Sequence, residues 1–82
     1  MASMRFGIFV PQGWRFDLVG IPDSDHWSTM KALAQRADAN PAWESIWVYD
    51  HFHTTPQYSE EATHEAWTLM AAFAAATDRV RL

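Results

Sequence analysis

The amino-acid sequence predicts an α/β fold on an incomplete parallel sheet, with elements in the order strand, helix, strand, helix and partial strand. Two short apolar segments, residues 5–10 and 45–49, alternate with two segments whose apolar residues recur every three or four positions. A third apolar segment begins at residue 80. This alternation is typical of parallel strands joined by right-handed crossovers, so we expect the strands to lie side by side with the helices packed against them.

The first strand is predicted over residues 5–10, a short apolar run that ends at Pro11. Its length and its ending are typical of a strand buried on both faces of a parallel sheet. The helix that follows is expected to begin near Ser24 or Asp25, which can cap its first turn, and to end at Asn40. Its predicted buried face consists of Trp27, Met30, Leu33, Ala34 and Ala37.

The second strand is predicted over residues 45–49, and the polar cluster Asp50-His51-Phe52-His53 follows it. In the next helix, Thr63 is expected to cap the first turn, and Glu65 to place a negative charge where the helix dipole favours it. The predicted buried face of this helix consists of Ala66, Leu69, Met70, Phe73 and Thr77. Residues 80–82 begin a third strand, so we expect the chain to be one piece of a longer protein.

The composition argues against several classes of function. The net charge is −4 and the six Lys and Arg residues are scattered, so no nucleic-acid partner is expected, because phosphate binding needs clustered basic residues. No apolar segment of about 18 residues and no signal-peptide pattern is present, so we expect no membrane partner and a cytoplasmic location. Without cysteine, neither disulfides nor thiolate metal sites can form. Residues 1–3 are expected to be a leader, and residues 4–82 the domain.

The chain has many large apolar side chains for its size, including five tryptophans in 82 residues. A chain of this length buries only roughly 60% of its unfolded surface, so we expect marginal stability. Trp47 and Trp67 lie in segments with core spacing and are expected to pack inside. Unpaired strand edges and an apolar inner sheet face favour association between copies. The sequence therefore predicts a homo-oligomer that is inactive by itself.

Three segments of the chain carry a resemblance to a known family. Ser45-Ile46-Trp47-Val48-Tyr49-Asp50-His51-Phe52 is similar to the second strand of the bacterial luciferase-like monooxygenases, particularly those that use the deazaflavin coenzyme F420. Residues 65–82 resemble that family's second helix and the start of its third strand, and residues 4–12 resemble its first strand. The resemblance implies a TIM (β/α)8 barrel, a fold of about 250 residues. Residues 4–82 would be its N-terminal part.

The resemblance also implies an activity and a cofactor. The family suggests an oxidoreductase that transfers a hydride to, or monooxygenates, a small organic substrate with F420 or FMN. The active site of such barrels lies at the C-terminal ends of the strands, and the cofactor phosphate commonly sits on the loops after strands seven and eight. The chain has only three glycines and no glycine-rich phosphate loop. No cofactor is therefore expected to bind tightly to this chain alone.

The candidate site residues follow the two predicted strands. The resemblance implies a histidine at position 51 that orients a flavin-type ring and handles a proton, and the adjacent Asp50 would favour the charged imidazole. Both are predicted to be catalytic and cofactor-binding; alternatively, Asp50 caps a turn and His51 is a solvated loop residue. Gln12 is predicted to bind the cofactor or to close a turn. Trp14 and Glu65 are predicted to contact the substrate, although Glu65 could serve only the helix dipole.

Two further interpretations remain open. His51 and His53 stand two positions apart, so on an extended segment their imidazoles point the same way and could share a metal ion, as in metal-dependent hydrolase barrels. Two ligands do not complete a metal site, and we expect no metal here. The other alternative is a non-catalytic α/β module that only associates with copies of itself.

Overall fold

A computed structural model describes residues 4–82; residues 1–3, predicted to be a leader, lie outside the described part. The predicted α/β class is confirmed, because two strands pair in parallel and a helix connects them. In this pair Ile8 lies opposite Ile46. The elements in chain order are β1 (Gly7–Phe9), the 3-10 helix η1 (Asp23–Asp25), α1 (His26–Ala39), β2 (Ser45–Trp47) and α2 (Ala66–Ala76).

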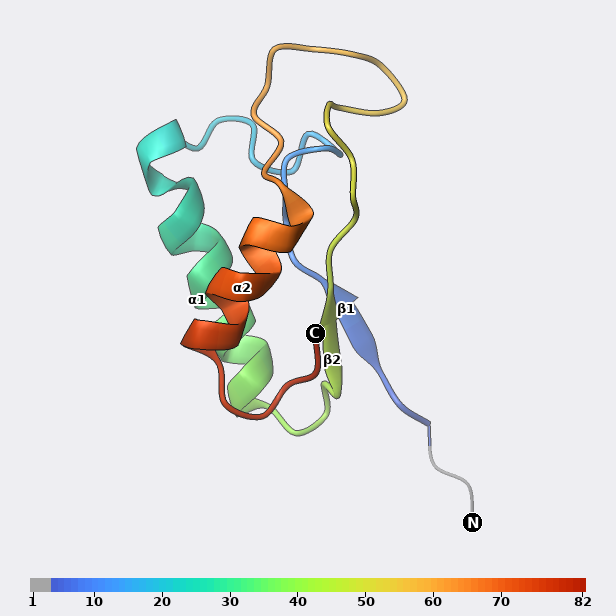
Figure 1. The fold of residues 1–82 in the computed structure, drawn as a ribbon, viewed down its shortest axis with the longest axis vertical. Coiled ribbons are helices and arrows are strands. Elements are labelled where there is room, and N and C mark those ends of the chain that lie inside the picture. The colour runs from blue at the N-terminus through green and yellow to red at the C-terminus, as the bar shows by residue number, and fades with distance from the viewer. Residues whose placement is uncertain (1–3) are drawn as a thin grey trace.

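The helices and the loops are arranged as parallel strands require. Both α-helices lie on the same side of the strand pair, and the loops that follow β1 and β2 meet at one end of the molecule (Figure 1). The predicted third strand is present as a parallel bridge between Ser45 and Arg81. β2 thus lies between β1 and the last residues of the chain, an order compatible with the start of a TIM barrel.

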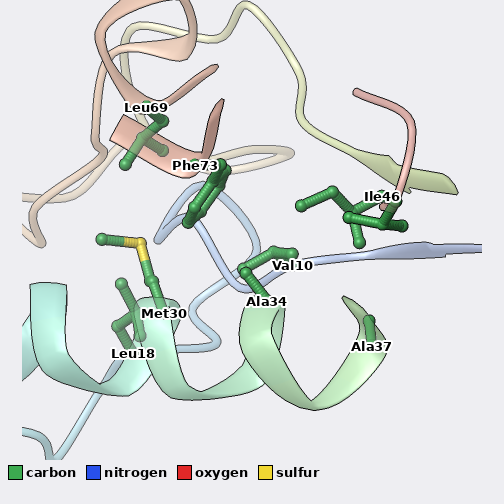
Figure 2. Packing of buried hydrophobic residues seen from close by; sticks show 9 residues of the cluster. Val10, Leu18, Met30, Ala34, Ala37, Ile46, Leu69 and Phe73 are labelled. Atoms are coloured by element: carbon green, nitrogen blue, oxygen red, sulfur yellow. The ribbon is translucent and has the colours of Figure 1, made fainter. Parts of the chain in front are cut away.

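The hydrophobic core lies between the helices and the strands (Figure 2). Phe73 of α2 and Met30 of α1 are each only 1% exposed. The predicted helical spacing holds at the centre of each face, because residues three and four positions apart point to the same side of a helix. The core residues shown from α1, α2 and the strand region are Met30, Ala34, Ala37, Leu69, Phe73, Val10 and Ile46.

The predicted burial is wrong at the margins of the α1 face. Trp27 and Leu33 are 39% and 38% exposed. Trp27 still stacks on Phe73, with ring centroids 5.8 Å apart. Side chains at the edge of an amphipathic stripe are covered on one side only, which explains these values.

The prediction that the first strand is buried on both faces is wrong. All three residues of β1 are exposed, and Phe9 reaches 52%. A strand is buried on both faces only where layers cover both sides of its sheet. Here the helices cover one side of the β1–β2 pair, and β1 is its edge strand.

The prediction that Trp47 and Trp67 pack inside is also wrong, since they are 57% and 71% exposed. Trp47 follows buried Ile46, and successive side chains of a strand point to opposite faces. Trp67 lies next to buried Ala66, about 100° around α2 from the buried stripe. Apolar composition predicts an element here but not which of its side chains face the core.

The helix ends differ in part from the sequence prediction. Thr63 is not the cap of α2, and its buried hydroxyl has no hydrogen-bond partner within residues 4–82. Glu65 is the cap instead. Asp25 stands at the cap position of α1 without a side-chain cap bond, and Asn40 ends this helix as predicted. No helix within residues 4–82 is long and apolar enough to cross a membrane.

The turn into the third strand is fastened to the end of α1. The Asp38 carboxylate accepts hydrogen bonds from the backbone N–H groups of Val80, Asp78 and Arg79, and these bonds hold its pKa below the usual value. The Arg79 guanidinium donates to the carbonyl oxygens of residues 37, 38, 40 and 43. These contacts join the end of α1 to the turn before β2.

Candidate functional site

The candidate site lies where the loops after β1 and β2 meet, at the carboxyl ends of the parallel strands (Figure 1). Proteins with parallel sheets commonly bind their ligands at this end. The loop after β1 brings Gln12 and Trp14, and the loop after β2 brings residues 49–53. The structure therefore brings most of the predicted site residues to one end of the fold.

Four rings form a continuous aromatic cluster there: Phe9, Trp14, Tyr49 and His51. Phe9 and Tyr49 stack with centroids 4.9 Å apart, and Trp14 meets Tyr49 edge-on at 4.9 Å. His51 lies 4.4 Å from the Trp14 ring and 5.6 Å from the Tyr49 ring. Phe9 and Tyr49 are 52% and 43% exposed, while Trp14 and His51 are half-buried. The cluster thus presents open ring faces beside an imidazole.

Charged groups of both signs lie at the edge of the aromatic cluster. The guanidinium of Arg15 stands over Trp14, 5.6 Å from the ring centroid, within cation–π range. Asp50 separates Tyr49 and His51 in the chain and is exposed. The cluster can therefore accept a planar apolar group while charged side chains contact polar substituents at its edge.

Gln12 is fully buried and joins the segments around the aromatic cluster. Its Nε2 donates to the carbonyl oxygens of Tyr49 and His64, at 2.6 and 2.7 Å. Its Oε1 accepts from the Tyr49 backbone N–H at 2.9 Å. Because both amide hydrogens and the amide oxygen are used inside the chain, the Gln12 side chain holds Tyr49 in place.

Gly13 allows the loop after β1 to approach the segment before α2. Its φ is +106°, a conformation that side chains rarely adopt, and a Cβ there would collide with the Ala62 carbonyl oxygen. The Gly13 N–H donates to the Asp17 carboxylate at 2.8 Å. This close approach places residues 62–64 directly beside Gln12.

Glu65, predicted to contact the substrate, caps α2. Its carboxylate accepts from the backbone N–H groups of Trp67 and Thr68 and from the Thr68 hydroxyl, with distances from 2.6 to 2.9 Å. The bonds to Thr68 and Trp67 lower the pKa of Glu65, because they favour the ionised carboxylate. These contacts are those expected from the alternative prediction, in which Glu65 serves the N-terminus of the helix.

His53 does not join His51. Its Nδ1 lies 2.9 Å from the Thr54 carbonyl oxygen, and its ring lies 5.8 Å from Tyr58. The His51 ring instead contacts Trp14 and Tyr49. Within residues 4–82, no three His, Cys, Asp or Glu side chains are close enough together to hold a metal ion.

His26 and His64 form another pair of histidines, which was not predicted from the sequence. His26 Nδ1 and His64 Nε2 are 3.0 Å apart, and His26 is only 3% exposed. Burial, and then the charge of His26, lower the pKa of His64, while Asp23 raises it. His26 lies four positions before Met30 on the buried stripe of α1, a spacing that could have indicated a buried imidazole.

The fold and the site together define an α/β unit with an aromatic and imidazole-bearing surface at the carboxyl ends of parallel strands, the arrangement of α/β-barrel enzymes. A family model described as luciferase-like monooxygenase matches residues 4–82. The chain belongs to this family, as its strand and helix motifs predicted. No curated protein and no solved structure matches the chain. Members of the family commonly use flavin or F420 cofactors.

Proposed function

We propose that this chain forms one wall of the flavin- or deazaflavin-binding site of an oxidoreductase that acts on a small organic substrate. The observation that carries the proposal is the aromatic cluster, four rings linked by successive contacts at the carboxyl ends of β1 and β2. Flat, partly exposed ring faces suit a planar heterocycle, because offset stacking is favourable at such separations. When bound, the cofactor would supply the hydride or oxygen chemistry.

The residues present fit the ring of such a cofactor better than its phosphate. Tyr49 and Phe9 offer exposed ring faces, and His51 offers an imidazole whose nitrogens can donate or accept a hydrogen bond. Asp50, next to it in the chain, is exposed and offers a carboxylate that can accept hydrogen bonds. No glycine-rich phosphate loop occurs in the sequence. We therefore assign ring orientation and proton handling to His51 and Asp50, and expect weak binding by this chain.

In this proposal Gln12, Trp14 and Glu65 have different tasks. Trp14 contacts both Tyr49 and His51, so it supports the cluster and contributes ring surface. Gln12 positions the Tyr49 backbone and acts on the cofactor only through that residue. Glu65 holds the first turn of α2, and we assign it no contact with the substrate.

Fluorescence titration of the chain with F420, and separately with FMN, tests this proposal. We expect saturable binding with a dissociation constant of about 0.1–1 mM, or roughly 4–5.5 kcal/mol. His51→Ala should weaken binding at least several-fold. His53→Ala is the matched control, since its ring lies in the same loop but contacts Tyr58, and it should bind as the parent chain does. Equal loss in both variants, or no saturable binding of either cofactor, would refute the proposal.

We also propose that copies of this chain associate through the open face of the sheet. Trp47 is 57% exposed and Phe9 52%, and register places them opposite one another on the face without helices. A second copy presents the same aromatic face, so pairing two copies would cover both. Because Phe9 also belongs to the aromatic cluster, association and cofactor binding would compete for this face. Light scattering across a dilution series should show an oligomer, and Trp47→Asp should shift it to monomer. A monomer at every concentration would contradict self-association.

A further inference from the structure

The histidine pair, in which His26 is buried and His64 half-buried, connects two segments that are far apart in the sequence. His26 is the first residue of α1, and His64 immediately precedes the cap of α2. Their rings meet edge-to-face with centroids 5.1 Å apart, and Nδ1 of His26 lies 3.0 Å from Nε2 of His64. The neighbourhood of each nitrogen defines which protons this contact can hold.

The neutral pair has one consistent arrangement of hydrogens. His26 Nε2 lies 2.9 Å from the Ile21 carbonyl oxygen, which only accepts, so Nε2 carries a hydrogen. In the neutral ring Nδ1 is then an acceptor, and it receives the Nε2 hydrogen of His64. A proton added at His64 Nδ1 keeps this bond but places a charge at a half-buried position. A second proton, on His26 Nδ1, leaves two donors facing each other and breaks the bond.

Few charged groups face the pair to offset added protons. From η1, the Asp23 carboxylate lies 3.6 Å from His26 Nε2, but its side chain is 91% exposed and the attraction is screened by water. Asp25, the cap residue of α1, directly precedes His26 in the chain. Its backbone carbonyl oxygen accepts hydrogen bonds from the hydroxyls of Ser28 and Thr29. From α2, the Glu65 carboxylate is bound to that helix's own first turn. Proton uptake by His64 is therefore opposed by burial and by the charge of His26.

A chain of backbone contacts leads from this pair to the aromatic cluster. The His64 N–H donates to the Gln12 carbonyl oxygen at 3.0 Å, and the His64 carbonyl oxygen accepts from Gln12 Nε2 at 2.7 Å. Gln12 in turn exchanges two hydrogen bonds with the backbone of Tyr49. Tyr49 carries a ring of the cluster. A displacement of His64 must therefore be transmitted through Gln12 to Tyr49, or break these bonds.

We propose that the His26–His64 pair is an acid-sensitive latch: its protonation releases the segment entering α2 and, through Gln12, loosens Tyr49 in the aromatic cluster. The latch uses no residue of the cluster itself and needs no bound ligand, so it stands independently of the proposed cofactor. The lowered pKa of His64 agrees in sign. Below about pH 6.5 the unfolded chain binds more protons at this residue than the folded chain, so the latch's contribution to stability is lost as the pH falls.

Nuclear magnetic resonance of the whole chain without ligand tests this latch, over a range from about pH 8 to about pH 5. We expect the backbone amide signal of Tyr49 to shift together with the imidazole signals of His26, because the His26–His64 bond is lost only when His26 Nδ1 also carries a proton. The hydrogen-exchange protection of that amide, corrected for intrinsic exchange at each pH, should fall about tenfold across the transition. In His64→Gln, whose amide can still donate to His26 but does not titrate, both changes should disappear.

The control variant is His51→Gln, which removes the imidazole ring inside the aromatic cluster and leaves the pair intact. The Tyr49 transition should persist in this variant with an unchanged midpoint. A Tyr49 amide that stays constant while both rings of the pair take up protons would overturn the latch, and so would a transition that His51→Gln abolishes. If His64→Gln does not fold, the parent chain and His51→Gln still decide between these outcomes.

Discussion

Both faces of the β1–β2 pair carry apolar side chains, but these side chains are buried on one face and exposed on the other. Ile46 is 3% exposed beneath the helices, whereas Trp47, the next residue, is 57% exposed on the opposite face. The helix side packs Phe73 and Met30 against the strands, and the other side carries the open rings of Phe9 and Tyr49. Burial is therefore decided by what lies opposite a side chain. One face supplies stability, and the other is the surface that we propose for binding.

If this contrast is correct, truncating the core side must have the largest effect. Phe73→Ala removes a ring that is 1% exposed, and such truncations cost about 3–5 kcal/mol. For a small domain with roughly 5 kcal/mol of stability, this loss should leave the chain largely unfolded. Denaturant unfolding followed by circular dichroism measures it. Phe52→Ala is the control, because Phe52 is 80% exposed and should lose almost nothing.

A smaller loss is expected at the boundary between the two faces. Gln12→Ala leaves the Tyr49 N–H and the Tyr49 and His64 carbonyl oxygens without their partner, which should cost about 2–3 kcal/mol. The same denaturation experiment measures this, with the exposed Gln57→Ala as control. Equal stabilities of the two variants would show that Gln12 does not connect the segments.

The Glu65 cap of α2 should contribute less to stability than Gln12, and its contribution should depend on pH. Glu65→Ala removes the acceptor for two N–H groups of α2 and should lower the Tm by a few degrees at neutral pH. Because the folded chain lowers the pKa of Glu65, its contribution is complete above about pH 4.5 and is lost as the pH falls through the folded pKa. The difference in Tm between the variant and the parent should therefore shrink in acid. Glu61→Ala should show no such difference.

The smallest effect on folding is expected on the open face. Trp47→Thr keeps a residue that favours strands and removes a ring that is 57% exposed, so unfolding stability measured at high dilution should change by less than about 0.5 kcal/mol. A loss comparable to that of Phe73→Ala would mean that Trp47 belongs to the core after all, and the contrast between the two faces would fail.

The elements that could be predicted from sequence are those set by local periodicity. Met30, Ala34 and Ala37 repeat at helical spacing and are buried together, as Leu69 and Phe73 are in α2. The parallel pairing followed from the alternation of strands and helices. The exposure of β1 did not follow, because a strand's sequence does not specify which layers cover it.

Within the candidate site, sequence placed residues near one another without revealing their partners. Trp14 and His51 follow different strands, and topology alone brings their loops together. The bonds of Gln12 to Tyr49 and His64 join positions 37 and 52 residues away, and no periodic pattern encodes such contacts. Thr63 and Glu65 are both chemically suitable caps, so only the backbone geometry selects Glu65.

The contacts of Arg79 determine where a third strand starts. One guanidinium is anchored to carbonyls at the end of α1 and in the turn before β2, and Arg81 bridges to Ser45 two residues later. The alignment of this third strand along β2 is thereby set by the Arg79 side chain, which lies outside the sheet. A slip of one residue, which would turn every side chain of that strand to the wrong face, would have to break several hydrogen bonds at once.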